Sequence, residues 1–213
     1  MLKLTQRQAH GFIFENKIRT EIFKLQARMN DTCIHDIIGC ENKFNNNETI
    51  SIKLTGSTKV DCGDITRLAS YDFTKKNTIM IGIYDKVNQH SIKIKRVIEI
   101  DYNMELHEKL FGSITLQELK DYDNLVKNLP KNQRVSNKLY LPQKKELQAK
   151  HNMTITINPK VDSKTQRRVQ CSINWDKLIK LYPEFIISDT NVKDNKIKIR
   201  DVDMIDLIIP YKN

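Results

Sequence analysis

The sequence has few of the residues that mark disulfide-rich or zinc-binding proteins. Its four cysteines, Cys33, Cys40, Cys62 and Cys171, form no C-x-x-C pair, and none stands in a Cys/His pattern of zinc-ligand spacing. The five histidines are scattered along the chain. We therefore expect reduced thiols and no structural zinc.

Long apolar runs are also missing. The longest, such as residues 78–83, are far shorter than the roughly 20 residues that a membrane span needs. The N-terminal segment MLKLTQRQAHGFIF lacks the apolar core of a signal peptide. We expect a soluble, intracellular (cytoplasmic) protein of 213 residues with no membrane partner, long enough to bury one core with a large insertion.

Acidic residues are scarce in one part of the chain. The net charge is +10, and residues 127–168 hold eleven Lys or Arg residues against two acids, so most of the excess lies in one fifth of the sequence. This distribution favours a polyanion as partner, with an ordinary solvated basic face as the alternative. Pro130, Pro142 and Pro159 interrupt the region, which disfavours a long amphipathic helix on a membrane.

The apolar pattern predicts an α/β fold with a mixed central sheet. Residues 5–29 show a helical stripe, and residues 32–38 and 49–55 read as strands joined by an Asn-rich turn. A short helix is expected just after them. The continuous apolar run 77–85 is typical of a strand covered on both faces, and 91–102 alternates as a half-buried strand does.

The second half has a mixed pattern of helices and strands. We expect helices at 104–111, 115–129, 144–151 and 175–182, a basic loop at 134–141, strands at 153–158 and 167–174, and one or two strands after residue 195.

Charged residues interrupt the apolar faces of the first half. Glu15 lies in the middle of the helical stripe, where an uncompensated carboxylate costs several kcal/mol. Either Arg19, four residues on, or a metal ion would compensate it. In the strand 49–55 alternate residues share a face, so Ser51 and Lys53 project together from the side opposite Ile50, Ile52 and Leu54.

Other acids are expected to approach Lys53. Asp36 ends the neighbouring strand, and an antiparallel hairpin would bring its carboxylate beside Ser51 and Lys53. Asp61 and Asp64 follow just after the strand. Phosphodiester hydrolysis uses such a set: carboxylates hold Mg²⁺, which lowers the pKa of a bound water, and a lysine stabilises the forming hydroxide.

Three segments carry these residues in succession along the chain: FIFENKI (12–18) provides a helical Glu, HDI (35–37) an acid, and SIK (51–53) a residue-x-Lys pair. Over about residues 8–100 this arrangement resembles the PD-(D/E)XK nuclease superfamily, which includes most type II restriction endonucleases and several junction resolvases. The resemblance implies a restriction-endonuclease-like core, a mixed central sheet flanked by helices, with Mg²⁺ as cofactor.

Two positions depart from the family pattern. His35 replaces the proline before Asp36, and Ser51 stands two before Lys53 where the family has an acid. A subgroup of restriction enzymes carries Ser-x-Lys and supplies the missing carboxylate from the following helix, a little over ten residues downstream.

The resemblance therefore implies a substitute acid after the strand. Asp64, eleven residues after Lys53, is the first choice and Asp61 the reserve, although either alternatively caps a helix. Glu48 ranks lowest because its parity places it on the side of Ile50.

The division expected from the sequence is a nuclease core at 1–102 and a basic α+β extension at 103–213 for DNA recognition and dimerisation, packed as one unit. Lysine and arginine hold phosphates, whereas asparagine and glutamine read base edges. The residues selected for DNA-backbone contacts are Lys59, Arg134, Lys138, Lys144, Lys145, Arg167 and Arg168. Those selected for base edges are Asn132, Gln133, Asn137, Gln166 and Gln170.

Together these features predict a Mg²⁺-dependent, sequence-specific endonuclease of double-stranded DNA that acts as a homodimer. Its expected catalytic residues are Asp36, Lys53, Ser51, Asp64 and Glu15, of which Asp36, Asp64 and Glu15, with Asp61 in reserve, bind the metal. A structure-specific nuclease such as a Holliday-junction resolvase is one alternative. A DNA-binding protein without catalysis is the other, because Ser51 removes a family ligand.

Overall fold

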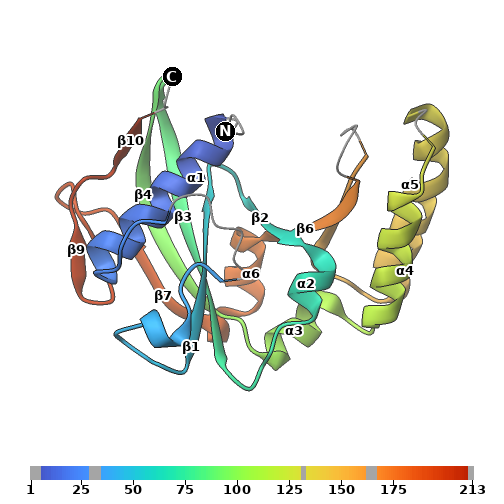
Figure 1. The fold of residues 1–213 in the computed structure, drawn as a ribbon, viewed down its shortest axis with the longest axis horizontal. Helices are drawn as coiled ribbons and strands as arrows, with labels where there is room; N and C mark the ends of the chain where they lie inside the picture. Colours follow the sequence, from blue (N-terminus) through green and yellow to red (C-terminus); the bar gives the residue numbers. More distant parts are fainter. Residues whose placement is uncertain (1–5, 29–34, 131–132, 162–166, 211–213) are drawn as a thin grey trace. The chain divides into compact units, whose positions relative to one another are not determined.

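A computed structural model describes residues 6–28, 35–130, 133–161 and 167–210 (Figure 1). The chain forms two compact units, the first from residues 1–58, 74–102 and 179–213 and the second from residues 59–73 and 103–178. The division after residue 102 that we expect from the sequence differs from these units in two segments. Residues 59–73 belong to the second unit, and the C-terminal segment from residue 179 belongs to the first.

The first unit is built on a mixed five-stranded sheet. Its elements are helix α1 (Gln6–Lys17), the π-helical turn η1 (Ile18–Ile22), the 3-10 turns η2 (Gly39–Glu41) and η3 (Pro183–Phe185), and strands β1 (Glu48–Thr55), β3 (Lys76–Asn88), β4 (Ser91–Asp101), β7 (Ile186–Asn191), β8 (Ile197–Ile199), β9 (Val202–Met204) and β10 (Ile208–Pro210). The sheet has the order β1–β3–β4–β10, and β7 also pairs with β4. Since β1 runs parallel to β3 while β3 and β4 are antiparallel, the predicted α/β class and mixed sheet are confirmed.

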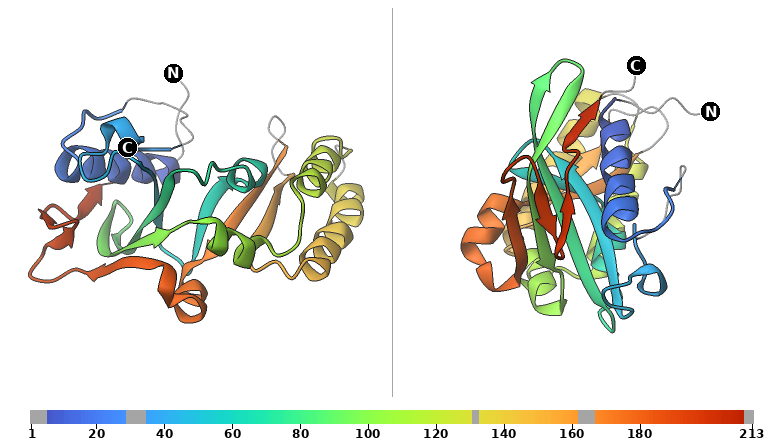
Figure 2. Two further views of the ribbon diagram at one scale, coloured as in Figure 1. Left: turned by 90° about the horizontal axis from the view of Figure 1, so that it is seen from below. Right: turned by 90° about the vertical axis from the view of Figure 1, so that its left-hand side faces the viewer.

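Helix α1 and the turn η1 that follows it pack against this sheet through apolar side chains. Phe14, Ile18 and Ile22 are fully buried, together with Ile50 and Met80 of the strands. Figure 2 shows α1, in blue, beside β1 and β10. Gly82 of β3 makes the close approach possible, because a Cβ there would lie only 2.4 Å from the Phe14 ring. Residues 77–83 are all buried, as predicted for a strand covered on both faces.

The helix predicted over residues 5–29 is wrong beyond Ile22. The chain leaves α1 through the π turn η1, and Lys24 then adopts a left-handed conformation (φ 60°) that ends the helix. The side chain of Asn16 holds the returning segment, because it accepts from the Arg28 amide (2.9 Å) and donates to the Arg28 carbonyl (3.2 Å). Met29, included in the predicted stripe, lies outside the described residues.

The second unit contains a three-stranded antiparallel sheet and several helices. Its elements are β2 (Lys59–Asp64), α2 (Ile65–Ala69), α3 (Met104–Phe111), α4 (Leu116–Lys127), α5 (Gln133–Lys150), β5 (Thr156–Lys160), β6 (Arg168–Asn174) and α6 (Trp175–Leu181), which begins in this unit. The strand order is β2–β6–β5. The expected helices α3, α4 and α6 and the strands β5 and β6 are confirmed within a few residues.

The basic loop predicted at 134–141 is wrong, because α5 runs through it and continues past Pro142. A proline inside a helix costs about 3 kcal/mol. Burial of Ser136 and Tyr140 on this helix, with the Tyr122 hydroxyl donating to the Tyr140 carbonyl (3.1 Å), offsets that cost. Strands β2 and β7 were not expected. No described helix is both long enough and apolar enough to cross a membrane.

Candidate active site

Asp36 and Lys53 meet at the edge of β1. Of the strand predicted at 32–38, the described part forms one antiparallel bridge, in which the Asp36 amide donates to the Ile50 carbonyl (2.9 Å) and the Ile50 amide to the Ile37 carbonyl (2.8 Å). The Asp36 carboxylate then accepts from the next outward-facing amide of β1, that of Ile52 (2.5 Å), and its Oδ2 lies 3.4 Å from Lys53 Nζ. The structure therefore brings the predicted acid and lysine together.

Ser51 lies beside His35 on the same strand edge. The Ser51 side chain is buried, and its Oγ is 3.5 Å from Nδ1 of His35. At this position, where the nuclease superfamily that the sequence resembles has an acid, the chain has a hydroxyl next to an imidazole. In the sequence His35 stands out only as a substitute for proline, and no spacing rule indicates its contact with Ser51.

Glu15 belongs electrostatically to the same group. This half-buried carboxyl has its pKa raised from 4.5 to about 7, first by burial and then by the negative charge of Asp36. The positive charges of Lys53, Arg19 and Arg28 act in the opposite direction. We define Asp36, Lys53 and Glu15 as the acid–lysine cluster.

Arg19 is not the ion-pair partner that its spacing from Glu15 predicts. Its guanidinium lies 3.4 Å from Glu41 and also donates to the backbone carbonyls of Asp36 and Gln26. The reason is the π turn that starts at Ile18. With a wider turn, residue i+4 no longer stands directly above residue i, so Arg19 faces the 36–41 segment.

Asp61 and Asp64 lie in β2 of the second unit. Asp64 is the N-cap of α2: its Oδ1 accepts from the Arg67 amide (3.0 Å) and from the Thr66 hydroxyl (2.7 Å). Asp61 accepts from the Gly63 amide (2.9 Å). Of the two roles that the sequence leaves open for Asp64, the cap is present, and the metal-binding role stays a prediction.

Glu48 has a structural partner that the sequence did not suggest. It is buried, as its parity predicts, and Arg200 donates to it through two nitrogens (2.7 and 2.8 Å). Arg200 also binds Glu99 (2.8 Å), and Asn42 donates to Glu48 (2.9 Å). We call Glu48, Glu99 and Arg200 the buried charge cluster, and its paired carboxylates explain why Glu48 is a poor candidate for metal binding.

In the part of the chain that the structure describes, the candidate metal ligands do not form a large cluster. There, no group of three or more His, Cys, Asp or Glu side chains is placed to hold a metal ion. In the first unit, the negative charge of Asp36, beside β1, acts on Glu15. Among the described cysteines, Cys40, Cys62 and Cys171 form no disulfide.

The candidate DNA-contacting cations all belong to the second unit. Lys59, Lys138, Lys145 and Arg168 are exposed, whereas Lys144 and Arg167 are half-buried. Burial and the positive charge of Lys59 lower the pKa of Lys144, so these two lysines act on one another. Arg167 donates to the Pro130 carbonyl (2.9 Å) and therefore also has a structural contact.

Some predicted contacts lie outside the described residues. These are Asn132, Gln166 and the side chains of Gln133 and Arg134. The remaining base-edge candidates, Asn137 and Gln170, are both half-buried, which makes them poorer candidates for reaching a base than exposed residues.

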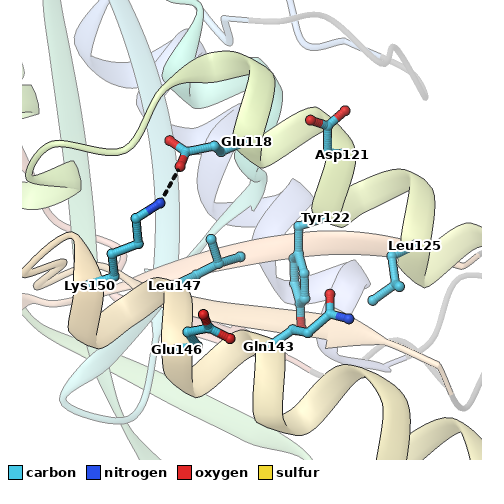
Figure 3. Close-up of a pocket in the computed structure, with 8 residues that line it drawn as sticks. All are labelled: Glu118, Asp121, Tyr122, Leu125, Gln143, Glu146, Leu147 and Lys150. Carbon is cyan, nitrogen blue, oxygen red and sulfur yellow. Dashed lines mark hydrogen bonds and ion pairs between the residues drawn. The ribbon is translucent and has the colours of Figure 1, made fainter.

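A hollow of about 390 Å³ lies between α4 and α5 (Figure 3). Its lining combines apolar side chains with three acids and one lysine, and a Lys150–Glu118 ion pair (2.9 Å) lies at one end. The residues are Glu118, Asp121, Tyr122, Leu125, Gln143, Glu146, Leu147 and Lys150. None of the candidate catalytic or DNA-contacting residues lines it.

Comparisons with known proteins do not identify a family for this chain. No family model matches the sequence, and searches of curated proteins and of solved structures found no match.

Proposed function

We propose that the protein is a Mg²⁺-dependent endonuclease that hydrolyses phosphodiester bonds of double-stranded DNA in the cytoplasm, as a homodimer of the type II restriction kind. The observation that carries this proposal is the 3.4 Å approach of Asp36 and Lys53, with Glu15 close enough for its pKa to respond to both. The mixed sheet behind them supports a restriction-endonuclease-like core.

The donor set fits Mg²⁺. This ion takes oxygen ligands and is commonly bound through one or two carboxylates, with waters and substrate phosphates completing its shell. Asp36 and Glu15 supply two carboxylates. Burial is the main cause of the raised pKa of Glu15, and repulsion by the Asp36 charge adds to it, so a divalent cation would relieve that repulsion. When bound, the ion would lower the pKa of a water and offset charge on the phosphate.

The residues of the chain have separate roles in this proposal. Lys53 is half-buried and would hold an attacking water or a phosphate oxygen with its ammonium group, while Asp36 orients that group. Ser51 cannot bind the metal as an acid would, so a further carboxylate from Asp64 or Asp61 remains part of the proposal. The cations of the second unit would hold the DNA backbone.

A DNA-binding protein without catalysis is the second candidate, and one observation favours it. The Asp36 carboxylate already accepts from the Ile52 amide and the Lys53 ammonium. It therefore has a structural role at the edge of β1 that needs no metal. Such a protein would retain DNA in a salt-sensitive way but would not cut it.

The test is incubation of the purified protein with long duplex DNA and, separately, with branched DNA, each with Mg²⁺ or with EDTA. Discrete Mg²⁺-dependent fragments of duplex DNA are the expected result. Cutting confined to branched DNA would indicate a junction resolvase, and retention without cutting would indicate a binder. No cutting of either substrate with Mg²⁺ or Mn²⁺ would contradict the proposal.

A further inference from the structure

We propose that Arg19 is a positioning residue, whose guanidinium holds the backbone at Asp36 so that the Asp36 carboxylate faces Lys53. The inference rests on the proposed function and adds to it a residue that touches neither substrate nor metal. Arg19 lies in the π turn η1, and its side chain is only 4% exposed.

Each side of the Arg19 guanidinium is engaged by a different part of the chain. NH1 donates to the Asp36 carbonyl, and Nε donates to the Gln26 carbonyl (3.2 Å). Both NH1 and NH2 also contact the Glu41 carboxylate, at 3.5 and 3.4 Å. A planar fork of donors can hold three acceptors in this way, whereas a lysine ammonium acts as a point charge.

The Glu41 carboxylate also binds groups other than Arg19, and these contacts hold the segment after Asp36. Arg28 donates to Glu41 (2.9 Å), and the Ile38 amide also reaches it (3.4 Å). Burial alone would raise the pKa of Glu41, but the hydrogen bonds from Arg19 and Ile38 outweigh it and lower that pKa. Glu41 therefore stays ionised and ties both arginines to the 36–41 segment.

The π turn directs Arg19 toward this segment. A regular helix would place residue 19 above Glu15, whereas in the observed turn the guanidinium reaches Asp36 and Glu41. The Asn16 side chain holds the returning chain at Arg28. These contacts form a frame around the backbone of Asp36, of the kind that catalytic groups need if their geometry is to be productive.

The Ile52 amide reports where the Asp36 carboxylate lies, independently of any activity. It donates to Asp36 Oδ2 (2.5 Å), so displacement of the carboxylate exposes this amide to solvent. The amide of Ile98, in the middle of the sheet and paired with Ile81, provides an internal reference for global unfolding.

The experiment compares Arg19→Lys with the matched control Arg28→Lys, which changes a Glu41 contact and a long bond to the His35 carbonyl (3.4 Å) but leaves the Asp36 carbonyl bonded. Hydrogen exchange of the two amides is followed by NMR in metal-free buffer. We expect Ile52 exchange to be at least about tenfold faster in Arg19→Lys than in Arg28→Lys, with Ile98 unchanged. Equal Ile52 exchange in the two variants would overturn the proposal.

A kinetic measurement separates positioning from a purely structural role. At saturating DNA, Arg19→Lys should lower kcat about 10- to 100-fold with KM within about twofold, since a displacement of about 1 Å has that effect. Added guanidinium should restore part of kcat in Arg19→Ala. An unchanged kcat despite faster Ile52 exchange would refute positioning. If the wild-type protein cuts no DNA while Ile52 responds, the proposed function fails and the structural assignment of Arg19 stands.

Discussion

Strand β1 carries a charged cluster near each end, and the two are built in opposite ways. Near its start, the side chains of Glu48 and Glu99 are each 2% exposed, and Arg200 binds both of them at 2.7 Å. Near its end, the side chains of Asp36 and Lys53 are 17% and 27% exposed and lie 3.4 Å apart. The carboxylates of the first cluster are sealed from solvent, although Arg200 is 13% exposed, whereas both side chains of the second pair are open to solvent.

The pKa shifts of the two clusters have opposite directions. Burial alone would raise the pKa of Glu48, but hydrogen bonds from Arg200 and Thr78 outweigh it and lower that pKa. At the other end, burial and the Asp36 charge raise the pKa of Glu15 to about 7. A satisfied cluster stabilises the fold, while a crowded pair of carboxylates is typical of a functional site.

The largest expected effect is loss of the buried charge cluster. In Arg200→Met two buried carboxylates lose their guanidinium, and removing one partner of a buried ion pair typically costs about 3–5 kcal/mol of unfolding free energy. Urea unfolding at pH 7 checks this. The control is Lys196→Met, which breaks an exposed pair with Asp203 (2.7 Å) on the same hairpin and should cost less than about 1 kcal/mol.

The second prediction concerns the open cluster, where we expect a large effect on activity and a small effect on stability. Lys53→Met should lower DNA cleavage about 100- to 1000-fold, the size expected when one charge-stabilising donor is removed. Its effect on unfolding free energy should stay below about 1 kcal/mol, because the pair with Asp36 is partly exposed. Cleavage rates and urea midpoints measure the two effects.

The control for Lys53 is Lys95→Met, which breaks an exposed pair with Asp85 (2.6 Å) and should leave cleavage unchanged. Undiminished cutting by Lys53→Met would show that the clusters do not differ in function.

The third prediction uses the raised pKa of Glu15. A carboxyl that holds its proton more tightly in the folded state contributes stability below its unfolded pKa, near 4.5, and that contribution is lost as pH rises through about 7. Glu15→Gln mimics the protonated form. In EDTA its stability advantage over the wild type should therefore grow from pH 4.5 to pH 7.5, reaching about 1–2 kcal/mol after allowance for solvent screening.

Thermal or urea unfolding across this pH range measures the Glu15 effect. A constant difference between Glu15→Gln and the wild type would show that the carboxyl is not crowded.

The open cluster could be anticipated from the sequence, but the sealed one could not. Period-two alternation places Lys53 on the outer face of β1, and a nearby antiparallel segment supplies Asp36. Arg200, in contrast, reaches Glu48 across 152 residues, from a left-handed turn (φ 49°) with no glycine or asparagine at that position to mark it. Long-range ion pairs leave no local pattern.

Helix ends were predicted least well, for related reasons. The apolar stripe continues past Ile22, so the pattern gives no sign of the π turn or of Lys24. Pro142 suggests a break in α5 that the packing of Tyr140 outweighs. In both places tertiary contacts decided the backbone conformation, and sequence periodicity does not report such contacts.

The smallest predicted effect separates the two roles of Asp64. Asparagine caps a helix about as well as aspartate, so Asp64→Asn should keep the bonds to the Arg67 amide and lose less than about 0.5 kcal/mol, whereas Asp64→Ala should lose about 1 kcal/mol. If Asp64 supplies the carboxylate that Ser51 lacks, both variants should reduce cleavage and Mg²⁺ affinity about tenfold, as a lost charged ligand would. Reduced cleavage in Asp64→Ala alone would mean that Asp64 acts only through α2, and the compensating acid would then have to be sought at Asp61.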